Sequence, residues 1–299
     1  YHMSLDSIKR MYSGKVKAII YPHLFGNMSD TIKIKEFCKE KNIYFIEDAC
    51  QSIGSSYNGI KAGTIGDIST FSFNANKVIS GAILTDDKEK IELFKKLRRH
   101  GNNEVLGYNS KMLLFNAEVI NHRLKKLDEY IQKRQDVAKQ YDEQLKDYVT
   151  IQSVPQSLNH NYHKYVIRLQ NKETRDRIKE MLGASVHYPK PISENKMYRN
   201  IKHRKDSLFV TNMVCNTILT LPIHPYMNKE EIDKVINSII ILIEQEDNRF
   251  LKSMERVLGD DMYDKSLINE TTEDVSFKNN RKLKIAFNKF YENLSRNTR

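Results

Sequence analysis

The stretch FIEDACQ, residues 45–51, and the stretch FSFNANK, residues 71–77, are the most informative parts of the chain. Each begins with an apolar run, which we interpret as a buried strand. The first run ends in a carboxylate, Asp48, and the second is followed by an amine, Lys77, 29 residues further along. Both side chains are thus predicted to lie just past the C-terminal ends of strands, where open α/β sheets bind their ligands.

A carboxylate and a lysine in this arrangement match what pyridoxal phosphate (PLP) chemistry requires. The lysine amine can attack the cofactor aldehyde to form a Schiff base. The carboxylate can keep the pyridine nitrogen protonated, so that the ring acts as an electron sink. Lys77 alone would carry no such weight, because the chain contains 49 lysine and arginine residues and most such side chains are solvated surface charges.

The two stretches, with GIKAGTIGD (residues 59–67) between them, resemble the DegT/DnrJ/EryC1/StrS aminotransferases, which are PLP enzymes that act on nucleotide-linked keto-sugars. The resemblance extends from about Lys15 to about Ile243. It implies an α/β protein with the type I PLP-dependent transferase fold, similar to aspartate aminotransferase. In that fold a large domain with a mostly parallel sheet, here only partial, is followed by a small α+β C-terminal domain.

The resemblance assigns roles to four residues near the two strand ends. Lys77 would be the catalytic lysine, which binds the cofactor and also moves protons between the carbons of the cofactor–substrate adduct. Asp48 would hold the pyridine nitrogen, and Gln51 would contact the region of the ring hydroxyl. Ser72 would hydrogen-bond the cofactor phosphate.

Further candidates lie later in the chain. Asn109 matches a residue that reaches across a dimer to the cofactor phosphate in the neighbouring subunit. Lys111 stands where the family usually has arginine, so it keeps the charge but loses the planar, bidentate fork. His187, in the segment HYPKP, is the best candidate for a small-domain contact to substrate. Lys111 and His100 are further candidates for substrate binding.

The same resemblance implies the reaction and the partners. Glutamate would donate its amino group to the cofactor, which would then aminate a keto-sugar attached to a nucleotide diphosphate. The product would be an amino sugar for surface polysaccharide or for a glycosylated metabolite. A homodimer is expected, and no metal site is predicted.

Two departures from the family pattern favour an alternative. The family has a further segment before the position of Lys15, including a Ser-Gly-Thr turn whose backbone amides hold the PLP phosphate. This sequence is therefore expected to be N-terminally truncated. In addition, only VISG, residues 78–81, separates Lys77 from the next predicted strand. The alternative is a truncated, catalytically inactive paralogue that acts as a partner subunit or is a non-functional fragment.

Composition excludes several other classes of protein. The net charge of +11 is partly local, since residues 278–299 hold seven basic residues and one acid. No RNA-binding or helix-turn-helix signature accompanies them, so a nucleic-acid partner is the least favoured interpretation. No window reaches the roughly 20 apolar residues that span a bilayer. Three widely spaced cysteines argue against a disulfide framework, and the cytoplasm is the expected location.

Four regions are predicted along the chain. Residues 1–115 would be the C-terminal part of the PLP-binding large domain, with parallel strands near 16–21 and 43–46. Residues 116–146 would form one long amphipathic connecting helix. Residues 147–246 would be the small domain, with a strand at 162–169 and helices at 172–182 and 229–244. Residues 247–299 would be a charged extension, partly helical or disordered.

Overall fold

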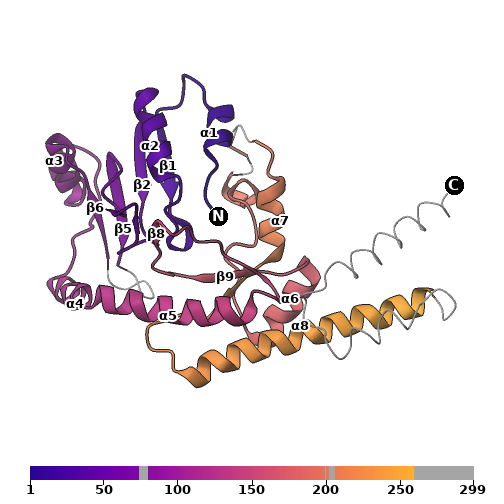
Figure 1. Cartoon of the computed structure of the whole chain (residues 1–299). Helices are drawn as coiled ribbons and strands as arrows, with labels where there is room; N and C mark the ends of the chain where they lie inside the picture. The colour runs from indigo at the N-terminus through magenta and orange to yellow at the C-terminus, as the bar shows by residue number, and fades with distance from the viewer. Residues whose placement is uncertain (74–79, 199, 202–205, 259–299) are drawn as a thin grey trace.

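A computed structural model describes residues 1–73, 80–198, 200–201 and 206–258 of the chain. The first part of the chain forms an α/β layer, and the second part forms a smaller α+β unit (Figure 1). This arrangement agrees with the predicted fold class. The predicted catalytic residue Lys77 and the two residues after it lie outside the described residues. The basic stretch 278–299 also lies outside them.

The first sheet contains four strands in the order β1-β2-β5-β6. The three strands β1, β2 and β5 are parallel, and β6 is antiparallel to β5. The bounds of the strands are Ala18–Pro22, Tyr44–Asp48, Ile68–Ser72 and Gly81–Leu84. Helix α2, Thr31–Glu40, connects β1 to β2, so the predicted strand–helix–strand unit with parallel pairing is confirmed.

The two faces of this sheet differ in burial. On one face Tyr21 and Phe45 are fully buried and pack against α2 and α1, Leu5–Met11. On the other face Ile20, Tyr44 and Ile83 are 62%, 50% and 55% exposed. The alternation of side chains along each strand places these three residues on one open apolar face. Parallel sheets are usually covered on both faces, so this open face is unusual.

The segment between β2 and β5 contains regular structure. It contains a short hairpin of β3, Ser56–Tyr57, and β4, Ile60–Lys61, whose turn places Asn58 and Gly59 at positive φ. Strand β8, Leu158–Asn159, adds to this hairpin from much later in the chain. The hairpin therefore connects the two parts of the molecule.

The predicted single helix over residues 116–146 is wrong in one respect. Two helices occupy this region, α4 at Leu114–Leu124 and α5 at Leu127–Leu145. The amide of Lys126 bonds back three residues to the carbonyl of Arg123 instead of four, which ends the first ladder. Both helices keep an apolar face, so a pattern of apolar positions does not reveal the interruption.

The second part of the chain is built on an antiparallel sheet in the order β10-β9-β7. Its strands are Ile218–Leu221, Tyr165–Arg168 and Thr150–Ile151. Helix α6 occupies Lys172–Leu182, as predicted, between the Asn171 cap and Gly183. One hydrophobic core joins the second half of α5 to β9, β10 and α8, and the hydroxyl of Tyr141 in α5 donates to the carbonyl of Pro222 at 2.8 Å.

Helix α8 extends over Lys229–Leu258, and the predicted end near residue 244 was too early. The helix runs beside α5 at one end of the molecule (Figure 1). Helices α3, Lys88–Leu97, and α7, Phe209–Thr217, complete the described fold. No helix within the described ranges has the length and apolar character needed to cross a bilayer. The division into four regions stays a prediction.

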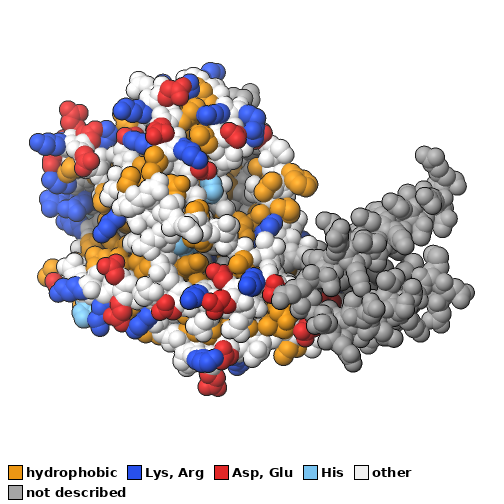
Figure 2. All heavy atoms as spheres, viewed as in Figure 1, with side chains coloured by type: hydrophobic (Ala, Val, Ile, Leu, Met, Phe, Trp, Pro, Cys, Tyr) orange, Lys and Arg blue, Asp and Glu red, His pale blue; other side chains and the backbone are white. Residues whose placement is uncertain are grey.

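Charge is unevenly spread over the molecular surface. In Figure 2, lysine and arginine side chains gather at the side of the molecule where Figure 1 shows α3, whereas both signs of charge are interspersed over the rest of that face. Two exposed arginines, Arg98 and Arg99, directly follow α3.

Candidate functional site

Asp48 lies at the C-terminal end of β2, between β1 and β5. Its side chain is on the open face of the sheet, because it is two and four residues from Ile46 and Tyr44 in a strand whose side chains alternate. The Oδ1 atom accepts hydrogen bonds from the amide of Cys50 at 3.2 Å and from the hydroxyl of Thr70 at 3.5 Å. These contacts fix the carboxylate at the edge where open α/β sheets bind ligands.

Ser72 shares this face and this edge. Thr70 is in register with Asp48, and Ser72 is two residues further along β5, so all three side chains point to the same side of the sheet. Ser72 is partly exposed. The structure therefore brings together a carboxylate and two hydroxyls from neighbouring strand ends.

Gln51 connects the sheet edge to the second part of the chain. Its Oε1 accepts a hydrogen bond from the amide of Phe25 at 2.7 Å, and its Nε2 donates to the hydroxyl of Tyr188 at 3.2 Å. Tyr188 follows His187 directly. Gln51 and the predicted small-domain segment HYPKP are thus in contact.

His187 is half-buried and its ring contacts β10. The Nδ1 atom lies 2.9 Å from the hydroxyl of Thr220. Burial, together with the nearby charge of Lys164, holds the pKa of His187 below its usual range. The imidazole is therefore neutral at neutral pH.

The other three candidates lie apart from this group. The amide of His100 donates to the carbonyl of Tyr108, and Arg99 pairs with Asn109, which closes a loop after α3. Asn109 and Lys111 follow on the exposed surface. Within the described ranges, neither they nor His100 hydrogen-bonds Asp48, Gln51 or Ser72.

The exposed segment around Asn109 and Lys111 is unusually apolar. Leu106 is 90% exposed, and the start of α4 presents Leu114 and Phe115 at 80% and 76%. Contiguous exposed apolar surface of this kind marks an interaction site.

Glu47 is a key residue of the site that sequence reasoning missed. Its side chain is fully buried on the covered face of the sheet, directly before Asp48. Its carboxylate accepts five hydrogen bonds, at distances from 2.6 to 3.1 Å, from His23 Nε2, the amides of Gly63, Ile65 and Gly66, and Ser69 Oγ. Strand alternation could have revealed it, because an acidic residue at an inward position requires donors.

The hydrogen bonds keep Glu47 ionised. Burial alone would raise the pKa of its carboxyl, but the hydrogen bonds from His23, Gly63 and Gly66 outweigh burial and hold the pKa below its usual range. The backbone amide of His23 also donates to the carbonyl of Asp48 at 3.1 Å. The buried carboxylate thus fixes the end of β2, on which Asp48 stands, to the end of β1, to the 63–66 loop and to β5.

Metal ligation has no candidate in the part of the chain that the structure describes, where no three His, Cys, Asp or Glu side chains group together. His160, three residues before His163, is buried, and its Nδ1 accepts a hydrogen bond from the amide of Tyr162.

Comparison with known proteins gives the site a context. A model of the DegT/DnrJ/EryC1/StrS aminotransferase family matches residues 1–240. The chain is 29% identical over 252 residues to dTDP-3-amino-3,6-dideoxy-alpha-D-galactopyranose transaminase of Aneurinibacillus thermoaerophilus, and the match covers 80% of this chain and 69% of the relative.

Two solved structures have a similar fold. A DegT DnrJ EryC1 StrS aminotransferase from Brucella abortus gives a TM-score of 0.74 at 26% identity, covering 80% of this chain and 69% of that chain. PseC of Helicobacter pylori, an aminotransferase involved in the biosynthesis of pseudoaminic acid, gives a TM-score of 0.75 at 25% identity, covering 82% and 71%.

Proposed function

We propose that this chain, which belongs to the DegT/DnrJ/EryC1/StrS aminotransferase family, transfers an amino group from glutamate to a nucleotide-linked keto-sugar with PLP as cofactor. The observation that carries the proposal is the position of Asp48. In a chain matched by the family model over residues 1–240, this carboxylate stands at the C-terminal edge of a parallel sheet, on the same face as Ser72.

The residues at this edge fit PLP. The hydrogen bonds from the Cys50 amide and the Thr70 hydroxyl both reach Oδ1 of Asp48, so that Oδ2 can accept from a protonated ring nitrogen. The hydroxyl of Ser72 fits a phosphate oxygen. When bound, PLP supplies an electron sink for the carbanion chemistry of amino transfer.

Each residue then has a defined task. Asp48 holds the proton on the ring nitrogen, and Ser72 donates to the phosphate. Lys77, outside the described residues, holds the cofactor and moves a proton between substrate carbons with its Nζ. Gln51 contacts the hydroxyl region of the cofactor ring. Through its hydrogen bond to Tyr188, it also holds the segment of the small domain that carries His187.

The names of two relatives support a nucleotide-linked sugar as the substrate. The Aneurinibacillus relative is named as a transaminase of a dTDP-linked amino sugar, and a further relative, 30% identical over 203 residues, is named GDP-perosamine synthase in Escherichia coli O157:H7. Both names specify a sugar attached to a nucleotide diphosphate. We assign this substrate class to the present chain, with His187 as its contact in the small domain.

A covalent trap tests the proposal. The full chain is incubated with PLP, reduced with borohydride, and digested for peptide mass spectrometry. We expect a phosphopyridoxyl label on Lys77 that is absent in Lys77→Ala and retained in the matched control Lys61→Ala. Prior addition of glutamate should abolish the label, because amino transfer from glutamate, which would leave as 2-oxoglutarate, would free Lys77 from the cofactor. Labels scattered over surface lysines and unchanged in Lys77→Ala would overturn the proposal.

The second candidate is a non-catalytic partner subunit. The open apolar face of the first sheet, with Ile20, Tyr44 and Ile83, favours it, because such a face can accept another polypeptide. Scattered labelling in the trap, together with stable binding of a catalytically competent relative, would support this candidate.

A further inference from the structure

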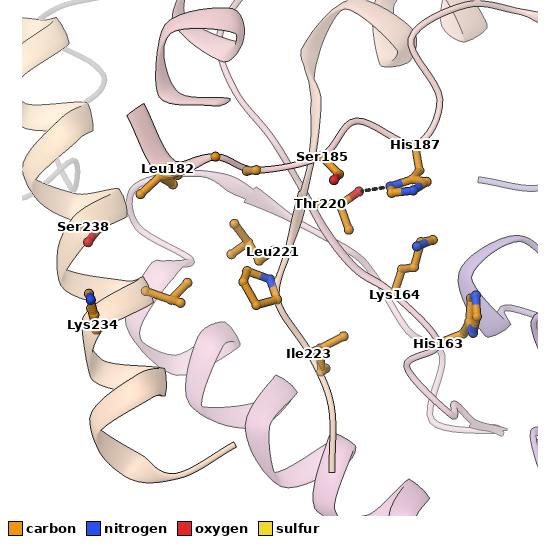
Figure 3. A pocket seen from close by; sticks show the side chains of 14 residues that line it. His163, Lys164, Leu182, Ser185, His187, Thr220, Leu221, Ile223, Lys234 and Ser238 are labelled. Carbon is orange, nitrogen blue, oxygen red and sulfur yellow. Dashed lines mark hydrogen bonds between the residues drawn. The ribbon is translucent and has the colours of Figure 1, made fainter. Parts of the chain in front are cut away.

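The second part of the chain contains a cavity of about 400 Å³, within the size range of small-molecule sites. It is formed by the two residues directly before β9, the turn after α6, the end of β10 with the residues that follow it, and one face of α8 (Figure 3). The middle of the cavity is apolar. It is lined by Leu221, the last residue of β10, and by Pro222 and Ile223, which follow the strand. One end of the cavity is polar and lies beside His187.

The lining of the cavity is basic. Of the residues that form it, four carry basic side chains, His163, Lys164, His187 and Lys234, and none is acidic. In Figure 3, Lys164 lies between His187 and His163, with its amine end toward His187, whereas Lys234 lies across the cavity on α8. The three residues at the β9 end form a compact group, which we call the basic cluster: His163, Lys164 and His187.

Lys164 has no anionic partner in the part of the chain that the structure describes. Its side chain is half-buried, and no carboxylate there lies within ion-pair distance of its Nζ. The Nη1 atom of the nearby Arg134 donates to the carbonyls of Tyr162 and Ile223, at 3.1 and 2.9 Å. Arg134 therefore adds positive charge next to the cluster.

Burial of this uncompensated charge is unfavourable, and it lowers the pKa of Lys164, with a smaller contribution from Arg134. Burial also lowers the pKa of His163 to about 4, with further contributions from Lys164, Arg134 and His187. Both histidines are therefore neutral donors at neutral pH. An anion held between these three groups would relieve the unpaired charge of Lys164.

The chemistry of the cluster fits a phosphate group. Lysine binds phosphate as a point charge, and neutral imidazole N–H groups can donate to phosphate oxygens. The cluster offers one lysine and two imidazoles. Its position is also suitable, because Tyr188, the neighbour of His187, contacts Gln51 at the proposed cofactor site.

We propose that Lys164 and His163, together with His187, bind the diphosphate of the nucleotide-linked substrate. This inference rests on the proposed function and deepens it, because it assigns the anionic part of the substrate to three residues of the small domain. The sugar would then extend from the cluster past Tyr188 toward Gln51 and Asp48. Lys164 is thus a determinant of affinity for the nucleotide and takes no part in proton transfer.

Calorimetry with thymidine diphosphate and thymidine tests the assignment on the full chain without PLP. We expect the diphosphate to bind roughly tenfold or more tightly than the nucleoside, and inorganic phosphate to compete with it. Lys164→Met should weaken diphosphate binding by roughly tenfold or more and leave nucleoside binding unchanged. Lys139→Met on α5, which removes the same charge from an exposed position, should bind as the unsubstituted chain does.

Two further variants test whether weaker binding could be caused by loss of the fold. Lys164→Arg keeps the charge and should retain most of the affinity, and His163→Gln should weaken diphosphate binding while the thermal unfolding midpoint is maintained. Unchanged diphosphate affinity in Lys164→Met would overturn the proposal. So would competition by 2-oxoglutarate, but not by phosphate, for the site that Lys164→Met removes.

The result of the calorimetry can be distinguished from the result of the PLP trap. If PLP labels Lys77 but thymidine diphosphate does not bind, or binds without dependence on Lys164, only the diphosphate site is wrong. If the diphosphate binds through Lys164 but PLP does not label Lys77, the site survives and the proposed aminotransferase function fails.

Discussion

Glu47 and Asp48 are adjacent in sequence but have opposite environments. Glu47 points to the covered face of the sheet, where five donors surround it, and Asp48 points to the open face. One residue therefore holds the backbone in place while its neighbour remains available for chemistry.

Replacement of Glu47 by glutamine should destabilise the protein by about 3 kcal/mol at neutral pH, because it removes a buried charge from its donors. The folded-state pKa of Glu47 lies below its ordinary value. Its stabilising contribution is therefore complete above about pH 4.3, the ordinary glutamate pKa, and is lost as the pH falls through the folded-state value. Urea unfolding of both chains at several pH values measures this difference.

The matched control is Glu40→Gln at the exposed end of α2, which should change the free energy of unfolding by less than about 0.5 kcal/mol. Equal urea midpoints for Glu47→Gln and the unsubstituted chain at pH 7 would show that the buried carboxylate does not hold the sheet edge.

Asp48→Asn should lower amino transfer by roughly a hundredfold or more, because the amide cannot stabilise a protonated ring nitrogen. The fold should be retained, since the asparagine Oδ1 can still accept from Cys50 and Thr70. The rate of the glutamate half-reaction, followed by the absorbance of the cofactor, measures the effect. Thr70→Ala removes one contact but keeps the carboxylate, so a loss of equal size in that control would contradict the assigned role.

Among the secondary-structure elements, α6 shows how local sequence sets a boundary. Asn171 caps its start by accepting from the amide of Thr174 at 2.9 Å, and Gly183 ends it at a φ of 60°. Gly183→Ala should destabilise the protein by about 1 kcal/mol, because a Cβ is disfavoured in the left-handed conformation. No atom lies within 4 Å of that Cβ, so the effect comes from the backbone alone.

Gly14 is the control for this prediction, since its added Cβ also meets no atom within 4 Å and its φ is not in the left-handed range. Gly14→Ala should be neutral or slightly stabilising. Thermal unfolding of both variants compares the two positions, and equal midpoints would refute the conformational explanation.

Element boundaries were predictable where a local signal exists and not elsewhere. The cap of α6 and the parallel pairing of β1 with β2 follow from residues in the elements themselves. The break between α4 and α5 depends on one backbone bond at Lys126, which the apolar pattern does not encode. The extension of α8 to Leu258 crosses a polar stretch, residues 244–249, at which the apolar pattern of the helix is interrupted.

At the scale of the whole molecule, the sequence located the sheet edge but not the contacts between distant segments. The position of Asp48 at this edge was predictable because ligand-binding residues of open α/β sheets follow the strand ends, whereas Ser72 was proposed from the family resemblance. The bond between Gln51 and Tyr188 joins residues 137 positions apart, and Lys164 meets His187 only after β9 and β10 have formed. No spacing rule within the sequence connects such pairs.

The exposed apolar segment around α4 should mediate association of two copies. Leu114→Asp combined with Phe115→Asp should shift the full chain from dimer to monomer in light scattering, without lowering the unfolding midpoint of the monomer, because both side chains are exposed. Met181→Asp, at an exposed apolar position on α6, should leave the dimer intact. A dimer that persists in the double variant would exclude this surface.

The positions of the Glu47 donors in the sequence also affect how the chain can fold during synthesis. His23 precedes this carboxylate by 24 residues, and Ser69 follows it by 22. A growing chain that has reached β2 therefore holds an acid that cannot yet be buried, because the amides at 63–66 and the hydroxyl at 69 have not been made. This edge of the sheet can therefore be completed only after the third strand has been made, because that strand and the loop before it supply four of the five donors.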